Sequence, residues 1–348
     1  MHDDSALMER RIRRELVERL MPAMYGASVP MTVQAWDTPG EPVSYAEAMA
    51  GLAAEGRAFT IGDRWSRPWG TTWFRFTADV PAEWVGTGLE AVIDLGFHPD
   101  SAGFQAEGLV WAPGADGQGE PVQGVHPRRT AVPLPGVGAG PLELVLEAAS
   151  NPAFPMVGTR MGHLGSLATA GDRPLFSLRQ ASLAVRNLDV FHLLLDAEVL
   201  LGLMTSLPAN GRRRQRLLRQ LQQAFDAIDL YDVAGTAAHA RRLLAPALAE
   251  RAVEHTHDVV AVGHAHIDTA WLWPLRETVR KVARTTSSMV TLLDEHPEFV
   301  YAMSSAQQYA WIKEHRPEVF ARVKQAVADG RFVPVGGMWV ESDAVLPA

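Results

Sequence analysis

The sequence predicts a multidomain chain with a β-sandwich or jelly-roll-like domain first, a helical connector second and an α/β unit with a parallel sheet last. Short strand-like runs separated by Gly and Pro fill residues 30–172, and helical periodicity dominates residues 173–255. In residues 256–348 strand-like and helical segments alternate, which is typical of βαβ units. A helical segment in residues 1–29 precedes these three parts.

The composition is that of a globular protein, and it limits the classes of function. The 348 residues include 32 Lys and Arg against 40 Asp and Glu, a net charge of -8, which excludes a generally basic nucleic-acid binder. No apolar run reaches the ~18 residues of a membrane-spanning helix, and we expect no secretory signal and no membrane partner. The chain has no cysteine, which excludes disulfides and agrees with a cytoplasmic location.

Residues 5–24 are expected to form a helix that packs against the rest of the chain. Apolar side chains recur there at three- and four-residue spacing among Arg and Glu: Leu7, Met8, Ile12, Leu16, Leu20 and Met21.

The following region carries the strand-like runs of the β-domain. They lie at residues 71–77, 89–95, 108–111 and 142–147, and two of them alternate in polarity as half-buried strands do. Four tryptophans in or near these runs allow two interpretations, namely stacking platforms for sugar or core aromatics of an accessory domain, and we favour the second: Trp65, Trp69, Trp73 and Trp111.

The helical connector contains three predicted helices, at residues 188–207, 213–228 and 233–250. The run Arg212–Arg216 at the start of the second helix could contact phosphate, but in an acidic chain we favour a solvated face. We expect no chemistry in this part.

The α/β unit is predicted from strands at residues 258–262, 299–303 and 332–337 and helices at about 275–296 and 306–328. The first strand is almost wholly apolar, as expected for a strand buried on both faces. In such folds, functional residues follow the carboxyl ends of the strands.

A group of metal-binding residue types follows the first of these strands. His264, His266 and Asp268 are two residues apart, so in an extended chain they lie on one side. Imidazole nitrogen and carboxylate oxygen are ligands that zinc accepts. A bare His-x-Asp is weak by itself, but here it ends a buried strand and is followed by Trp271 and then Arg276.

Three segments resemble glycoside hydrolase family 38, the α-mannosidases, and in particular the cytosolic/vacuolar-type and bacterial subgroup with an N-terminal β-domain. They are Gly263–Pro274 (Gly-His-Ala-His-Ile-Asp-Thr-Ala-Trp-Leu-Trp-Pro), Tyr301–Trp311 and Gly336–Asp343, in the family's order. The resemblance implies that residues 256–348 are the first three βα units of an irregular (β/α) barrel, and it is close over about 257–348 and looser before.

The resemblance also assigns roles to individual residues. It makes His266 and Asp268 two of the zinc ligands and Trp271 the aromatic side chain that packs against the mannose ring. His264 would lie beside the ligands and support them, and Asp343 would lie near the site or begin a helix. Co²⁺ and Mn²⁺ stay open as alternatives to Zn²⁺, because His/Asp sites accept several divalent ions.

The implied reaction is hydrolysis of terminal α-linked mannose from oligosaccharides by double displacement, with retention of configuration. The family's nucleophilic Asp is expected in a later segment like Trp-Leu-Pro-Asp-x-Phe-Gly, and its acid/base carboxyl and last His ligand are expected later still. None of these matches a position in this chain. We therefore expect this chain to be the N-terminal portion of a longer enzyme and to be inactive alone. The linkage preference and the oligomeric state stay open, and a homo-oligomer of the full-length enzyme is one alternative.

Two other functions are weighed against this one. A metal-dependent polysaccharide deacetylase-like hydrolase also uses His/Asp sites on an irregular β/α barrel, but its metal would activate water. A non-catalytic carbohydrate-binding β-sandwich protein would bind glycan without any metal. The later Asp-containing segment separates the first alternative from the mannosidase, and glycan binding without residues 257–348 would identify the second.

Overall fold

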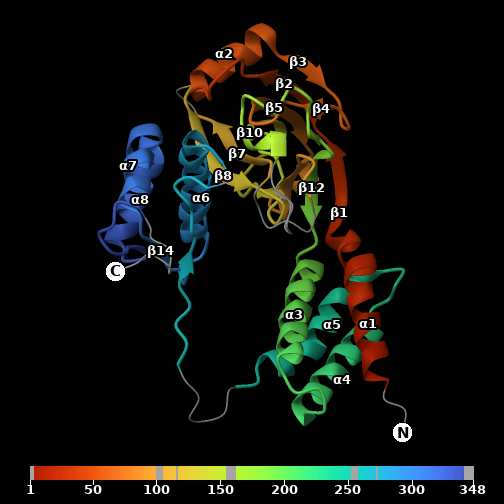
Figure 1. The fold of residues 1–348 in the computed structure, drawn as a ribbon. Coiled ribbons are helices and arrows are strands. Elements are labelled where there is room, and N and C mark those ends of the chain that lie inside the picture. The colour runs from red at the N-terminus through yellow and green to blue at the C-terminus, as the bar shows by residue number, and fades with distance from the viewer. Residues whose placement is uncertain are drawn as a thin grey trace.

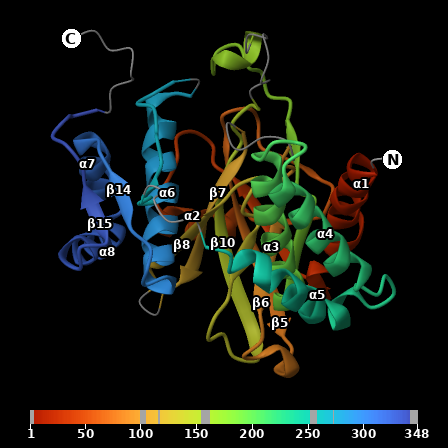
Figure 2. The same cartoon turned by 90° about the horizontal axis from the view of Figure 1, so that it is seen from below.

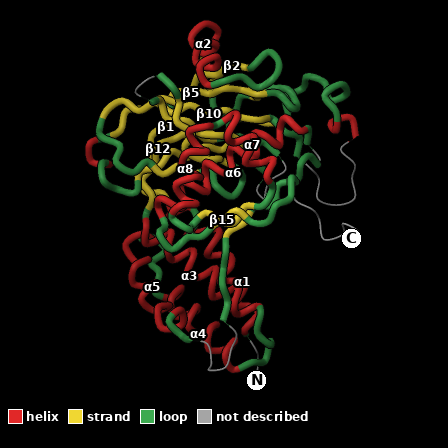
Figure 3. The backbone as a smooth tube through the Cα atoms, turned by 90° about the vertical axis from the view of Figure 1, so that its left-hand side faces the viewer, coloured by secondary structure: helices red, strands yellow, loops and turns green. Residues whose placement is uncertain are grey.

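The computed structural model places two further parts, a helical bundle and an α/β unit, around a central β-sandwich. The helical bundle lies below the sandwich, and the α/β unit lies along one side of it (Figures 1 and 3). The structure describes residues 4–98, 105–114, 117–153, 162–251, 258–271 and 273–340.

The β-sandwich consists of two antiparallel sheets. The six-stranded sheet has the order β3-β2-β5-β10-β7-β8, with β2 (Thr32–Asp37), β3 (Arg57–Phe59), β5 (Thr71–Val80), β7 (Glu107–Pro113), β8 (Gly119–Val125) and β10 (Gly140–Ala149). The four-stranded sheet has the order β1-β12-β6-β9, with β1 (Tyr25–Pro30), β6 (Leu89–Asp94), β9 (Ala131–Pro133) and β12 (Gln180–Arg186). A short pair, β4 (Arg64–Trp65) and β11 (Phe176–Ser177), and a 3-10 turn, η3 (Ala82–Trp84), complete it. The strands extend beyond residues 30–172 at both ends.

Alternation along β5 and β10 divides the six-stranded sheet into two faces. Phe74 and Phe76 turn toward the other sheet and form the main core with Leu144 and Leu146. On the opposite face, Trp73 packs with its neighbours under the helix α2 (Tyr45–Glu55). Both faces of this sheet are therefore covered. This explains why polar and apolar residues alternate only in part along its strands.

The four tryptophans considered above as platforms for sugar are all buried, so the platform interpretation is wrong for them. Trp65 belongs to the core between the sheets, and Trp73 and Trp111 pack beneath α2. Trp69 is buried with Trp273 of the α/β unit. A sugar ring needs an exposed aromatic face, which none of these four side chains offers.

Helix α2 begins with a capping box. The Ser44 hydroxyl accepts from the Glu47 amide at 3.3 Å, and the Glu47 carboxylate accepts from the Ser44 amide at 2.9 Å. We expect Ser44→Ala to lower the free energy of unfolding by about 1 kcal/mol, as measured by chemical denaturation. Glu47→Gln keeps an acceptor for the Ser44 amide and should retain most of the stability, and an equal loss in both variants would contradict this role of the hydroxyl.

The helical bundle joins the N-terminal segment to the connector. Helix α1 (Ser5–Glu15) continues into a π-helical turn, η1 (Leu16–Leu20), and a 3-10 turn, η2 (Pro22–Met24), and packs with α3 (Leu188–Thr205), α4 (Arg212–Asp226) and α5 (Val233–Leu248) around a separate apolar core. In the basic run at the start of α4, Arg214 pairs with Glu9 and Arg216 with Glu250. The Arg216 side chain is half exposed, as expected for a solvated face, but the side chains of Arg214 and Glu9 are only 14% and 18% exposed, so the solvated-face interpretation holds for only part of the run.

The α/β unit forms an open parallel sheet with the order β13-β14-β15. Its strands are β13 (Gly263–His264), β14 (Tyr301–Met303) and β15 (Phe332–Pro334), and its helices are α6 (Leu275–Glu295), α7 (Ala306–His315) and α8 (Pro317–Ala328). The βαβ order was predicted correctly. The described residues form no barrel, because three strands are too few to close one.

The strand predicted at residues 258–262 is wrong. β13 begins at Gly263, whose amide donates to the Val300 carbonyl at 2.8 Å, and residues 258–262 lie in no strand. Val259 and Val260 are 87% and 85% exposed. In the described part of the chain no neighbouring strand runs beside them, so the apolar run has no ladder to join.

Helix α6 lies between the six-stranded sheet and the helices α7 and α8 (Figure 2). It runs along β8, where Ser288 Oγ accepts from the Gly124 amide at 2.9 Å and Thr291 Oγ1 donates to the Val122 carbonyl at 2.8 Å. A Cβ at Gly124 would lie 3.3 Å from Cβ of Arg284, so glycine permits this close approach. The second half of α6 is thus fixed against the sandwich.

Candidate active site

The three sequence segments singled out above meet at the carboxyl edge of the parallel sheet. The loop after β13 is held by α7, because the buried Gln308 side chain donates from Nε2 to the Ile267 carbonyl at 3.2 Å. The third segment lies against the same helix start, where the Ala306 and Gln307 amides donate to the Met338 and Trp339 carbonyls. The edge is therefore built from residues of all three segments.

His266 and Asp268 lie side by side in the loop after β13. Nε2 of His266 is 3.2 Å from Oδ1 of Asp268, and both side chains are partly exposed. Two ligands at about 2.0–2.2 Å from one tetrahedral zinc ion would be about 3.4 Å apart, so this pair fits two positions of such an ion. Among the described residues no third His, Asp or Glu joins them.

His264 occupies the end of β13 and faces its neighbouring strand. Its Nδ1 lies 2.9 Å from the Ala302 carbonyl, which can only accept, so Nδ1 carries the proton. The structure thus places His264 two residues from His266, bonded to the backbone of β14. Asp343 lies outside the described residues.

Trp271 is an exposed aromatic side chain in the loop after β13, which we call the site loop. It is 52% exposed, and its ring meets that of the buried Trp273 edge to face, with centroids 5.7 Å apart. Trp273 Nε1 donates to Thr278 Oγ1 at 2.9 Å, and this hydroxyl is 3.4 Å from the Asp268 carbonyl. The first turn of α6 therefore contacts both the backbone of Asp268 and the ring of Trp273.

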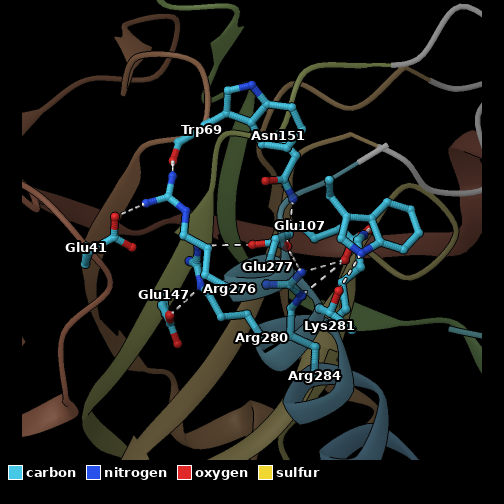
Figure 4. A network of polar contacts seen from close by, with 12 residues as sticks. Glu41, Trp69, Glu107, Glu147, Asn151, Arg276, Glu277, Arg280, Lys281 and Arg284 are labelled. Carbon is cyan, nitrogen blue, oxygen red and sulfur yellow. Dashed lines mark hydrogen bonds and ion pairs between the residues drawn. The ribbon is translucent and has the colours of Figure 1, made fainter. Parts of the chain in front are cut away.

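A buried ionic network, which sequence reasoning missed, attaches α6 to the sandwich (Figure 4). Glu147 of β10 accepts from Arg280 Nε at 2.9 Å, and Glu107 of β7 accepts from Lys281 Nζ at 2.5 Å and from Arg284 at 3.0 Å. Glu277 bonds Arg284, Arg280 Nη1 at 3.2 Å and Asn151 Nδ2 at 2.8 Å. The sequence held one sign of this network. The charged residues of α6 in this network lie on the same face of the helix as Ser288, and that face packs against the sheet.

A cavity of about 350 Å³ opens between the β-sandwich and the α/β unit. The sandwich contributes Glu107 and His126 to its lining, and the α/β unit contributes His266, Trp273 and Lys281. The candidate site therefore lies close to the interface with the sandwich.

The network lowers the pKa of two carboxyl groups. Burial raises the pKa of Glu107, but the charges of Lys281 and Arg284 outweigh it and hold this pKa at about 2. Burial also raises the pKa of Glu277, and Arg284 and Arg280 more than offset it, so the net shift is downward.

We predict that acid weakens the contact between α6 and the sandwich. A carboxyl pKa lowered from 4.5 to about 2 contributes stability that is present above about pH 4.5 and is lost as the pH falls toward 2. The shift corresponds to about 3 kcal/mol for Glu107. Hydrogen exchange of the α6 amides against pH should report it, and Glu107→Gln should flatten the dependence in this window. Equal pH profiles for both proteins would contradict the assignment.

Comparisons with known proteins agree on one family. Residues 256–348 match the "Glycosyl hydrolases family 38 N-terminal domain", and residues 29–184 match the "Alpha-mannosidase, jelly roll domain". "Alpha-mannosidase 2C1" of Homo sapiens is 36% identical over 334 residues, which cover 93% of this chain and 30% of that protein. "Alpha-mannosidase G" of Dictyostelium discoideum is 27% identical over 310 residues, with 88% and 27% covered. "Alpha-mannosidase" of Saccharomyces cerevisiae is 29% identical over 306 residues, with 84% and 27% covered.

The two family matches fall on two of the three parts described above, the sandwich and the α/β unit. The chain spans about 30% of the length of the first curated relatives it matches. The chain therefore belongs to glycoside hydrolase family 38, and it matches the N-terminal portion of the α-mannosidases in that family.

Proposed function

We propose that the full-length protein is a zinc-dependent, retaining α-mannosidase that removes terminal α-linked mannose from oligosaccharides or glycans. The observation that carries the proposal is the pairing of His266 Nε2 with Asp268 Oδ1 at 3.2 Å, at the carboxyl edge of the parallel sheet and in the same loop as the exposed Trp271. The names of the curated relatives agree with this activity.

The residues of this chain would bind and orient the sugar. His266 Nε2 and the Asp268 carboxylate would hold the zinc ion, which, when bound, supplies Lewis-acid polarisation and an anchor for sugar hydroxyls. Trp271 would lay its exposed ring against the C–H face of mannose. The hydroxyl of Thr278 and the Gln308 amide hold the backbone of this loop, so the three side chains keep a fixed spacing.

The two catalytic carboxyl groups match no position among the 348 residues, so we propose that this chain alone hydrolyses no α-mannoside. The barrel stays part of the same proposal, with the open sheet of β13, β14 and β15 as its first strands. A cytoplasmic location and a homo-oligomer stay predictions from the sequence. No described helix is long and apolar enough to cross a bilayer.

The alternatives differ in what they release or bind. A polysaccharide deacetylase would use the same His266 and Asp268 and release acetate. A carbohydrate-binding sandwich would need exposed aromatic side chains, and the four tryptophans first considered for that role are buried.

The proposal is tested by giving the full-length protein p-nitrophenyl-α-mannoside and following both products. We expect p-nitrophenol, with α-mannose as the first anomer seen by proton NMR, because double displacement retains configuration. The 348-residue chain, assayed in parallel, should release none. β-Mannose as the first product would contradict the retaining mechanism, and acetate release from acetylated glycans without mannoside cleavage would establish the deacetylase.

A further inference from the structure

Lys281 connects the sandwich directly to the site loop. Its Nζ lies 2.5 Å from Glu107 Oε1 and 4.7 Å from the centroid of the Trp273 ring. The side chain is buried, so its charge has little contact with water. A buried ammonium needs a counter-charge, and Glu107 supplies it.

The carboxylate of Glu107 is itself fixed. Its second oxygen accepts from Arg284 at 3.0 Å, so the two oxygens have two different cationic partners on α6. β7 therefore determines where the ammonium of Lys281 lies, and the ammonium lies over the ring of Trp273.

Trp273 is the next member of this line of contacts. Its ring is buried with Trp69 and Ala170, two residues of the chain before the connector. The ring face lies toward Lys281, and its Nε1 donates to Thr278 Oγ1 at 2.9 Å. Packing, a cation–π contact and a hydrogen bond together leave the ring one orientation.

The exposed end of the line is Trp271. Its ring plane stands at 86° to that of Trp273, with centroids 5.7 Å apart, which is the favourable edge-to-face arrangement. A half-exposed tryptophan without such a neighbour would exchange between rotamers. The contact with Trp273 favours one of them.

We propose that Glu107, Lys281 and Trp273 are positioning residues for Trp271, so that the β-sandwich sets the orientation of the aromatic side chain that faces the ligand. The identity of that ligand as a mannoside rests on the proposed function, whereas the line of contacts does not. The sandwich thereby acts on substrate binding through Trp271.

The orientation of Trp271 can be measured in the 348-residue chain by fluorine NMR after incorporation of 5-fluorotryptophan. Trp271→Phe and Trp273→Phe assign the two resonances. In Lys281→Met, which keeps the length of the side chain and removes its charge, we expect both resonances to shift or broaden. Lys281→Arg restores a cation and should return them toward the wild-type positions. Lys324→Met, an exposed lysine of α8, is the matched control and should change neither.

Glu107→Gln provides the second variant, because the amide keeps the volume of the carboxylate. An unchanged Trp65 resonance, from the sandwich core, shows in each case that the protein is folded. A Trp271 resonance that keeps its position and width in both folded variants, whether or not that of Trp273 moves, would overturn the proposal.

The full-length protein gives the kinetic test. We expect Lys281→Met to raise KM for p-nitrophenyl-α-mannoside about threefold to thirtyfold while kcat changes less than twofold, with Lys281→Arg between the two. A threefold to thirtyfold fall in kcat with unchanged KM would contradict a role in sugar binding. If the wild-type protein cleaves no mannoside but the fluorine shifts are found, the proposed function fails and the positioning of Trp271 stands.

Discussion

Replacing Glu277 by alanine is expected to lower the local stability of α6 by about 3–5 kcal/mol, because it leaves three buried cations of α6 with only two carboxylate partners in the network. Glu277 is 2% exposed, and its carboxylate bonds the guanidinium groups of Arg280 and Arg284 and the amide of Asn151. The alanine removes this acceptor from all three, so that Arg280 keeps only Glu147 and Arg284 keeps only Glu107 as carboxylate partner.

Hydrogen exchange of the α6 amides, read as opening free energies, measures this loss. The matched control on the same helix is Asp294→Ala, which removes a more exposed carboxylate 2.7 Å from Arg322 and should cost no more than about 1 kcal/mol. Glu277→Gln keeps an acceptor and a donor and should fall between the two. Equal costs for Glu277→Ala and Asp294→Ala would show that the network does not hold α6 on the sandwich.

The second large effect is expected at the metal pair. His266→Ala and Asp268→Ala should each reduce bound zinc in the full-length protein and lower kcat/KM for p-nitrophenyl-α-mannoside by more than about 100-fold, since even groups that only orient metal ligands are worth about 10–100-fold. Zinc content by atomic absorption and kcat/KM on the same preparations measure both effects.

Two histidines serve as graded controls. His264→Ala removes a ring bonded to the backbone of β14 and should cost less than His266→Ala. His296→Ala removes an exposed ring beyond the C-terminal end of α6 and should leave zinc content and activity unchanged. Full zinc content in His266→Ala would exclude His266 as a ligand.

Local pattern was enough to predict most of the helices but only some of the strands. The alternation in residues 71–77 and 142–147 predicted β5 and β10, and apolar periodicity placed α3 and α6 within two residues of their ends. The same signal failed at residues 258–262, because an apolar run indicates burial only where a neighbouring strand exists, and none lies beside it in the described residues.

The residues of the candidate site were predicted from a sequence motif, but the contacts that surround them were not predicted. His266, Asp268 and Trp271 are close in sequence, so their spacing could be recognised. Glu107 and Lys281 are 174 residues apart, and nothing local to either residue indicates the other. A charge on the buried stripe of α6 was the only local sign that a counter-charge had to come from elsewhere.

The most direct test of the account is the return of activity with metal. The full-length protein is stripped with a chelator, and p-nitrophenol release from p-nitrophenyl-α-mannoside is followed as zinc is added, with His266→Ala treated in the same way. We predict that the wild-type protein loses its activity with the chelator and regains it with zinc, and that His266→Ala stays inactive. Full mannosidase activity in the stripped protein, or zinc-restored activity in His266→Ala, would contradict the account.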